Sequence, residues 1–234
     1  MSVIFYSGRG GAAGVNHVPL TGAEPNFVVA FNCNGNMVDL AGDVSFAGQS
    51  LGYIANGSYD GLRDVVTLPN GGSVLISTAG TTHRLPISSP ISYGGFFKFN
   101  LIQVTVPHFI YCGDNVDSPT NYGAAVNSNL IQRVNAGPTF NEFAPRDAWF
   151  HFCITEPANR TSSKLYINGA LVSTVTSSTP GTSSGTEDFC IGTRYNRTNT
   201  STGGQCESIF VADVELDADT VRTIAENAFG HPLP

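Results

Sequence analysis

The chain has 234 residues, of which 41% are hydrophobic and 12% charged, with a net charge of −7 and a pI near 5.0. The hydrophobic fraction excludes a disordered composition, and the acidic balance, with lysine only at Lys98 and Lys164, excludes a basic nucleic-acid-binding face. No apolar run approaches the ~18 residues that cross a bilayer, and the first residues lack the basic segment of a signal peptide. We therefore expect neither nucleic acid nor a membrane as partner.

Short apolar or alternating runs, separated by turn residues, predict strands along the whole chain. Phe27–Asn32 is apolar on both faces, which indicates a central strand. The glycine-rich residues 8–14 are interpreted as a surface loop or as an arm that docks on a neighbouring subunit, and residues 135–148 as a loop. The strands expected ahead of that loop are Ser2–Ser7, Phe27–Asn32, Ser50–Ala55, Asp64–Leu68, Ser73–Ser77, Gly94–Val106, His108–Cys112, Tyr122–Val126 and Leu130–Val134.

The clearest local signal is a hairpin after Trp149–Thr155, which is itself an aromatic and β-branched strand. Ser163–Ile167 alternates, with Leu165 and Ile167 on one face. Ala170–Thr176 alternates too, and we expect Leu171, Ser173 and Val175 on one face. Asn168-Gly169 lies between these two strands, and both residues tolerate positive φ, which predicts a type I′ turn.

The last third of the chain contains two further strands and a helix. The strands are expected at Phe189–Gly192 and Ser208–Val214, with a loop at residues 195–204. Asp217 is a suitable N-cap and Gly230 a suitable left-handed C-cap. The helix between them has one apolar stripe, formed by Val221, Ile224, Ala225, Ala228 and Phe229.

Three segments resemble laminin G-like domains, within the concanavalin A-like lectin/glucanase superfamily. The Trp149-x-His151 strand with KLYINGALV resembles the central hairpin, and residues 189–194 and 210–229 resemble the closing strands and helix. Cys206-Glu207-Ser208 departs from the usual glycine-led start. The resemblance covers residues 149–229 and implies an all-β jelly-roll sandwich with one C-terminal helix. We expect one domain over residues 1–234, with residues 1–26 as its N-terminal strand and arm.

The cysteines do not indicate a metal site, because their number is odd and none forms a CxxC motif. Three of them lie in apolar strands, which predicts buried, reduced thiols, with one or two disulfides as the alternative. The five positions are Cys33, Cys112, Cys153, Cys190 and Cys206.

The sequence contains only weak candidates for a catalytic site. Glycosidases of the superfamily need two carboxylates about 5–5.5 Å apart on one strand face. Asp213, Glu215 and Asp217 form the only alternating acidic trio, but they lead out of a strand into the helix cap, so we interpret them as structural. In the resembling family Trp149 and His151 occupy framework positions. We therefore expect no enzyme.

Two groups of residues are candidates for binding. Tyr122 and the segment Arg194-Tyr195-Asn196 offer an aromatic platform with polar neighbours for a sugar, and an ordinary surface loop is the alternative. Asp114, Asn115 and Asp117 offer the oxygen ligands that calcium prefers, and a polar turn explains them equally well. We expect no obligatory cofactor, with calcium as the alternative.

A lectin-like fold without a secretion signal suggests a virion protein assembled in the host cytoplasm; an extracellular domain is the alternative. The first hypothesis is a non-enzymatic bacteriophage virion protein: a capsid decoration (cement) protein, a head fibre or a tail component. It would form a homo-oligomer and bind other virion proteins, such as a major capsid protein, and also host glycans. The alternatives are a stand-alone carbohydrate-binding lectin module and a glycoside hydrolase.

Overall fold

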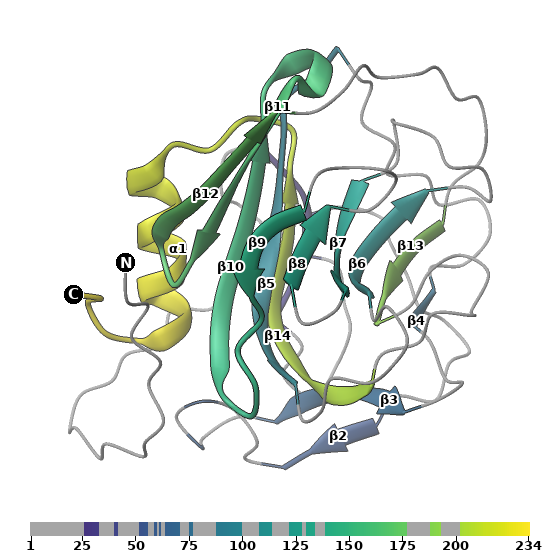
Figure 1. The fold of residues 1–234 in the computed structure, drawn as a ribbon. Helices are drawn as coiled ribbons and strands as arrows, with labels where there is room; N and C mark the ends of the chain where they lie inside the picture. Colours follow the sequence, from purple (N-terminus) through teal and green to yellow (C-terminus); the bar gives the residue numbers. More distant parts are fainter. Residues whose placement is uncertain are drawn as a thin grey trace.

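The structure, a computed structural model, has two antiparallel β-sheets and one α-helix among the residues that it describes, which confirms the expected all-β sandwich (Figure 1). The expected first strand, Ser2–Ser7, the glycine-rich arm and Cys33 lie outside the described residues. The described residues are 26–32, 40–41, 52–55, 59, 61, 64–70, 75–76, 88–99, 108–113, 122–127, 130–133, 139–176, 188–192 and 202–234.

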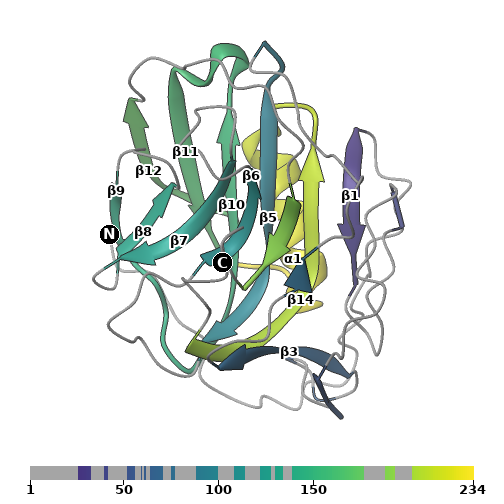
Figure 2. The same ribbon diagram turned by 90° about the vertical axis from the view of Figure 1, so that its right-hand side faces the viewer.

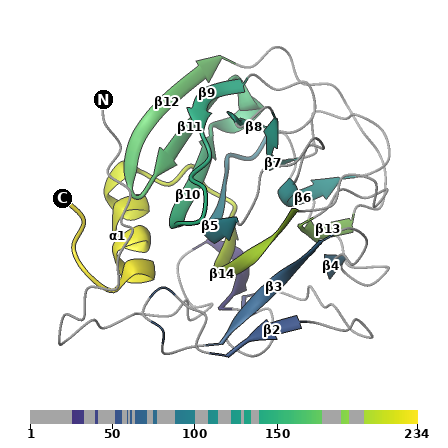
Figure 3. The ribbon, with the colours of Figure 1, turned by 60° about the horizontal axis from the view of Figure 1, so that its bottom comes forward.

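The larger sheet has eight strands, in the order β12-β11-β10-β5-β14-β3-β2, and β1 pairs with β14 beside this path. β12 and β2 form its two ends, on opposite sides of the molecule (Figure 3). The strands are β1 (Phe27–Phe31), β2 (Gly52–Ile54), β3 (Val65–Asn70), β5 (Ile91–Phe99), β10 (Trp149–Glu156), β11 (Ser162–Ile167), β12 (Ala170–Thr176) and β14 (Thr202–Ala212).

The smaller sheet has six strands, in the order β4-β13-β6-β7-β8-β9, and packs against one face of the larger sheet. Between them lies a core rich in phenylalanine, in which the rings of Phe97, Phe99, Phe109, Phe150 and Phe152 contact one another. The strands are β4 (Leu75–Ile76), β6 (His108–Gly113), β7 (Tyr122–Asn127), β8 (Leu130–Arg133), β9 (Thr139–Phe143) and β13 (Asp188–Ile191).

Helix α1 (Ala218–Phe229) covers the outer face of the larger sheet (Figure 1). As predicted, Asp217 caps its start by accepting a hydrogen bond from Thr220 N–H, and Gly230 ends it with φ of 75°. The five residues of the predicted apolar stripe are all buried. Burial of each large side chain contributes about 1.5–3 kcal/mol, which fixes the helix on the sheet.

The Asn168-Gly169 turn has φ values of 49° and 76°, as a type I′ turn requires, and joins β11 to β12 as predicted. One detail of this hairpin prediction is wrong. A bulge lies opposite Leu165 and Tyr166, so Leu171 pairs with Tyr166 on the helix side while Ser173 pairs with Leu165 on the core side. Leu171 therefore does not share a face with Ser173 and Val175.

Three other predictions need correction. Among the described strands β1 pairs with β14 and with no other, so it is not placed in the middle of the sheet; on its other side Leu40 N–H donates a backbone hydrogen bond to Ala30 O. The expected loop at residues 135–148 contains β9. β14 begins at Thr202, inside the expected loop at 195–204. In each case tertiary pairing overrides a weak local signal.

Candidate binding surface

Of the residues predicted to bind a ligand, the structure describes Tyr122 alone. Its side chain is fully buried, with its ring centroid 5.4 Å from that of Tyr93. The ring is thus part of the core and does not offer the exposed stacking platform that we expected. The other predicted binding residues, Arg194, Tyr195, Asn196, Asp114, Asn115 and Asp117, lie outside the described residues.

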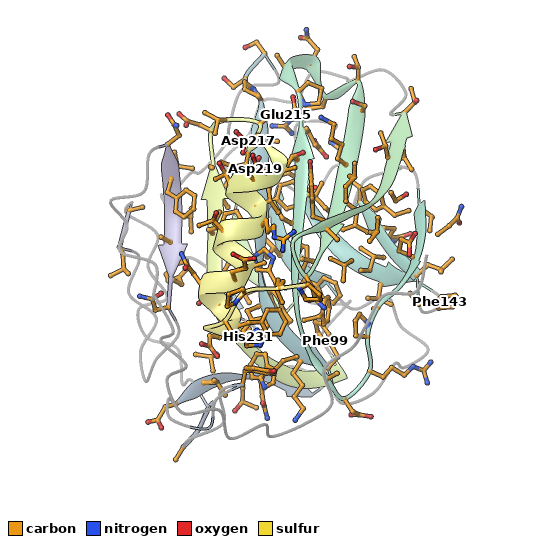
Figure 4. All side chains as sticks on the ribbon, turned by 90° about the vertical axis from the view of Figure 1, so that its left-hand side faces the viewer. Phe99, Phe143, Glu215, Asp217, Asp219 and His231 are labelled. Carbon is orange, nitrogen blue, oxygen red and sulfur yellow. The ribbon has the colours of Figure 1, made fainter. Side chains whose placement is uncertain are left out.

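Two members of the acidic trio before α1, Glu215 and Asp217, have structural partners. Glu215 forms an ion pair with Lys164, with 2.7 Å between the carboxylate oxygen and Nζ. Asp217 is occupied as the helix cap, and its hydrogen bond from the Thr220 backbone lowers the pKa of its carboxyl group. Glu215, Asp217 and Asp219 follow the chain into the first turn of the helix (Figure 4). Within the described ranges, no group of three or more His, Cys, Asp or Glu side chains is placed to hold a metal ion.

A buried charged cluster lies between the sheets around Glu156, at the end of β10. Arg133 of β8 donates from Nε to Oε1 of Glu156 at 2.5 Å and from Nη2 to Oε2 at 3.3 Å. Ser163 donates to Oε1 at 3.0 Å. Arg160 adds a second guanidinium, with Nε at 3.8 Å from Oε2. The cluster therefore joins β8, β10, β11 and the turn before β11.

The charged groups of this cluster are buried, and burial and neighbouring charges shift the pKa values of Tyr93 and Arg133. Burial raises the pKa of Tyr93 well above its usual value, and the negative charge of Glu156 adds to that effect. Burial lowers the pKa of Arg133, but Glu156 outweighs this effect and the net direction is upward. Glu156 is fully buried and carries no second carboxylate among its described partners. It is a structural ion pair rather than half of a catalytic pair.

Trp149 and His151 project from β10 toward the helix side and are buried. Trp149 stacks on Phe96 at 4.9 Å between ring centroids, and His151 stacks on Phe210 at 6.1 Å. Burial lowers the pKa of His151 to about 3 and raises that of the neighbouring Cys153 thiol. A neutral imidazole beside a protonated thiol is not an activated nucleophile.

Among the described residues, Phe143 at the end of β9 is the most exposed of the large hydrophobic side chains, with 68% of its area exposed. Its ring stands away from the sandwich at the sheet margin (Figure 4). A single exposed apolar side chain is ordinary on a protein surface, but an aromatic ring has a flat apolar face on which a ligand can stack.

The segment that carries Phe143 is held firmly by its neighbours. Phe140, Ala144 and Pro145 are buried on either side of it. The backbone N–H of Asp147 donates to the carbonyl of Phe99 at 2.7 Å. Asn141 and Asp147 both have positive φ, which turns the chain sharply at each end. The ring is therefore presented by a closely folded segment.

Polar side chains surround Phe143 in sequence, and we call residues 141–147 the Phe143 ridge. Asn141, Arg146 and Asp147 are exposed, and Glu142 is partly buried. An aromatic face with amide, guanidinium and carboxylate groups beside it matches the chemistry of a sugar, which has apolar C–H faces and many hydroxyl groups. The sequence signal for this ridge is the pair of polar residues on each side of Phe143, a pattern that is also typical of the loop expected at residues 135–148.

Comparison with solved structures shows the fold. The binding domain of Paraclostridial Mosquitocidal Protein 1 aligns with a TM-score of 0.64 and 13% identity, over 89% of this chain and 56% of that one. The receptor binding domain of botulinum neurotoxin D gives a TM-score of 0.65 and 14% identity, with the same coverage. Trypanosoma rangeli sialidase gives 0.62 and 12%, over 88% of this chain and 33% of that one.

The chain thus spans little more than half the length of the first two of these structures. No protein-family model matches the sequence, and no curated protein matches it in sequence. No helix among the described residues is long and apolar enough to cross a membrane.

Proposed function

We propose that this protein is a non-enzymatic recognition module that binds a glycan, with the ring of Phe143 as its stacking platform. The observation that carries the proposal is the 68% exposure of Phe143 on a firmly anchored strand end, among exposed Asn141, Arg146 and Asp147. Stacking of a sugar face would cover the ring, and the polar groups would hydrogen-bond the hydroxyl groups at its rim.

The names of the structural neighbours support binding rather than catalysis. Two of them are receptor-binding or binding domains, and the binding domain of botulinum neurotoxin DC was solved in complex with SialylT. SialylT is a ligand of that toxin domain, and these structural neighbours share only the fold with the present chain. The shared sandwich supports the proposal because it can present loops and strand ends for recognition without any catalytic group.

The arrangement of the described acids favours a binding module over a glycoside hydrolase. Glycoside hydrolysis needs a carboxylate pair that faces the substrate. Glu156 is sealed between the sheets with two arginines, Glu215 is paired with Lys164, and Asp217 caps the helix. We therefore propose that the protein has no hydrolase activity.

A more specific proposal is that the protein is part of a bacteriophage virion. What supports it is the low fraction of charged residues, 12%, and the sequence's richness in uncharged polar residues. In that setting the protein would be a capsid decoration, head-fibre or tail component in the virion, bound to a shell protein, and the glycan would belong to the host. Stoichiometric copies in a purified particle would support this setting, and a protein that never associates with any particle would contradict it.

The test of the proposed function is a glycan array with the whole chain, run with and without calcium. The matched variants are Phe143→Ala and Leu171→Ala, each of which removes an exposed large apolar side chain from a sheet margin. We expect binding of at least one glycan class by the wild type and by Leu171→Ala, and loss of that binding in Phe143→Ala. Absence of any glycan signal from the wild type would refute the proposal.

A further inference from the structure

His151 is a titratable side chain that lies fully buried beneath α1. It is on the helix side of β10, with Trp149 and Cys153 two residues away on either side. Trp149 packs in one apolar cluster with Ala225 of the helix, and Cys153 packs in another with Val221. Figure 2 shows α1 behind the larger sheet, on the face opposite to the smaller sheet. The imidazole is therefore enclosed between the sheet and the helix.

Neither ring nitrogen of His151 has a hydrogen-bond partner among the described residues. The ring stacks on Phe210, with 6.1 Å between the ring centroids and an interplanar angle of 11°. Buried polar atoms are nearly always hydrogen-bonded in native proteins, so an imidazole without partners calls for an explanation. The neutral ring has one N–H group to satisfy, whereas the charged ring has two and a charge that must be solvated.

No described titratable or charged group compensates for a proton on this ring. Glu207 of β14 lies across β5 from His151, since both residues pair with Phe96, and Arg222 of α1 is paired with Glu226. Burial is the cause that lowers the pKa of His151 to about 3, whereas a carboxylate in contact would raise it. The other titratable groups that the surrounding strands place on this face are Lys98, Cys153 and Tyr166.

The segment that leads into α1 is fixed to the larger sheet by polar contacts. Oγ of Ser92 donates to the carbonyl of Val214 at 2.7 Å and accepts from the backbone N–H of Leu216 at 2.9 Å. Between these two residues, Oε1 of Glu215 lies 2.7 Å from Nζ of Lys164. Residues 214–216 thus stay with the sheet and provide a fixed pivot for the helix that follows.

The helix itself meets the sheet through apolar side chains, such as Val221 and Phe229. Its polar side chains bind within their own segment. Nε of Arg222 donates to Glu226 at 2.9 Å, and both side chains bind the backbone of Leu233. Apolar contacts are non-directional, so α1 and the residues after it can separate from the sheet as one unit, at a lower free energy than global unfolding.

We propose that α1 is a pH-sensitive cover of the larger sheet: when His151 takes up a proton, the helix separates from the sheet at residues 214–216 while the sandwich stays folded. In the open form water reaches both ring nitrogens and solvates the charge. The apolar face beneath the helix, with Phe96, Trp149 and Phe210, becomes exposed at the same time.

The direction of the pH dependence follows from the two forms. The pKa of an imidazole is about 6.5 in water and about 3 beneath the helix, so the open form binds more protons between these values. The opening equilibrium constant therefore rises up to about tenfold for each pH unit below about 6.5, and levels off below about 3.

The experiment is hydrogen exchange of the full chain at about pH 7.5 and about pH 4.5, corrected for the intrinsic pH dependence of amide exchange. His151→Phe keeps a ring beneath the helix but cannot take up a proton. The control, His231→Gln, removes the exposed histidine that follows α1. We expect the opening constant of the α1 amides to rise about a hundredfold in the wild type and in His231→Gln, and less than about threefold in His151→Phe.

Amides of β5 are the internal reference, because they report on unfolding of the sandwich. At both pH values they should remain at least about tenfold more protected than the α1 amides. Equal opening constants for α1 and β5 in the wild type would overturn the proposal, since the helix and the sandwich would then open together. The full pH response in His151→Phe, or its loss in His231→Gln, would overturn it as well, because another group would then drive the opening.

Discussion

Asn168 and His151 are joined by two hydrogen bonds that lock the hairpin turn onto β10. The backbone N–H of Asn168 donates to the carbonyl of His151 at 2.8 Å, and Oδ1 of Asn168 accepts from the backbone N–H of His151 at 3.0 Å. The side chain of Asn168 thus extends the sheet by one rung beyond the last residue of β11. The most recognisable residue pair of the sequence, Asn168-Gly169, is a joint between strands as well as a turn.

Replacement of Asn168 separates these two roles. Asn168→Gly keeps the positive φ but removes the side-chain hydrogen bond, so we expect a loss of about 1 kcal/mol of unfolding free energy. Asn168→Ala also forces a Cβ-bearing residue without a polar side chain to φ of 49°, which adds about 1–2 kcal/mol. Urea unfolding measures both. Equal stability of the two variants would show that the backbone conformation contributes nothing.

Burial of His151 predicts acid sensitivity. Its pKa is lowered from 6.5 to about 3 in the folded protein, so the unfolded chain binds more protons between these values. Stability therefore falls as the pH drops below about 6.5, by up to about 1.4 kcal/mol per pH unit for this one group, and levels off below about 3. His151→Phe keeps a ring against Phe210 and removes this dependence.

The measurement is urea unfolding of both proteins at about pH 7.5 and about pH 4.5, where the wild type should lose roughly 2–3 kcal/mol more than His151→Phe. The carboxyl groups also titrate in this pH range, but they do so equally in both proteins, so their contribution to the loss of stability cancels in the comparison. The same loss in both proteins would mean that the imidazole is protonated in the fold.

The cluster at Glu156 should be the most sensitive ion pair of the described chain. Glu156→Gln removes the carboxylate charge that both Arg133 and Arg160 face in the interior, and we expect a loss of about 3–5 kcal/mol. The control is Glu226→Gln, which breaks the exposed pair with Arg222 and should cost less than about 1 kcal/mol. Similar losses in the two variants by urea unfolding would contradict the buried position of Glu156.

The four described cysteines, Cys112, Cys153, Cys190 and Cys206, are buried free thiols, in agreement with the sequence prediction. We expect them to react with an alkylating reagent only when the protein opens, because the reagent cannot reach a sulfur atom that is fully buried. Mass spectrometry of alkylated peptides during a urea series should show all four modified along with global unfolding. Rapid labelling of Cys153 in the native protein would contradict its position beneath α1.

Much of the fold was predictable because its signals are local. The Asn168-Gly169 turn, the alternation of Leu165 and Ile167, and the caps Asp217 and Gly230 each act within a few residues, and all are confirmed. The order of the strands in the sheets and their pairing could be predicted less well from the sequence. The apolar run of β1 indicates a central strand, yet among the described strands β1 has β14 as its one neighbour, and the residues that pair far along the chain are not marked in the local sequence.

The candidate site was not predictable, because exposure is a property of the folded chain. Tyr122 and Phe143 are both aromatic residues at strand ends, but Tyr122 points into the core and Phe143 into solvent. Phe143 lies next to an irregular step in the register between β8 and β9, where Leu130 pairs with Phe143 and Gln132 with Thr139, whereas Tyr122 pairs with Cys112 of β6. The buried contact of Glu156 with Arg133 likewise joins residues 23 positions apart.

The most direct test of glycan recognition at the Phe143 ridge is calorimetric titration of the strongest glycan from the array into the wild type, Phe143→Ala and Leu171→Ala. We predict that Phe143→Ala weakens binding at least about tenfold, or about 1.4 kcal/mol, with unchanged unfolding free energy because the ring is exposed. Leu171→Ala should bind as the wild type does. Wild-type affinity in Phe143→Ala would contradict a stacking role for this ring and place the binding surface elsewhere.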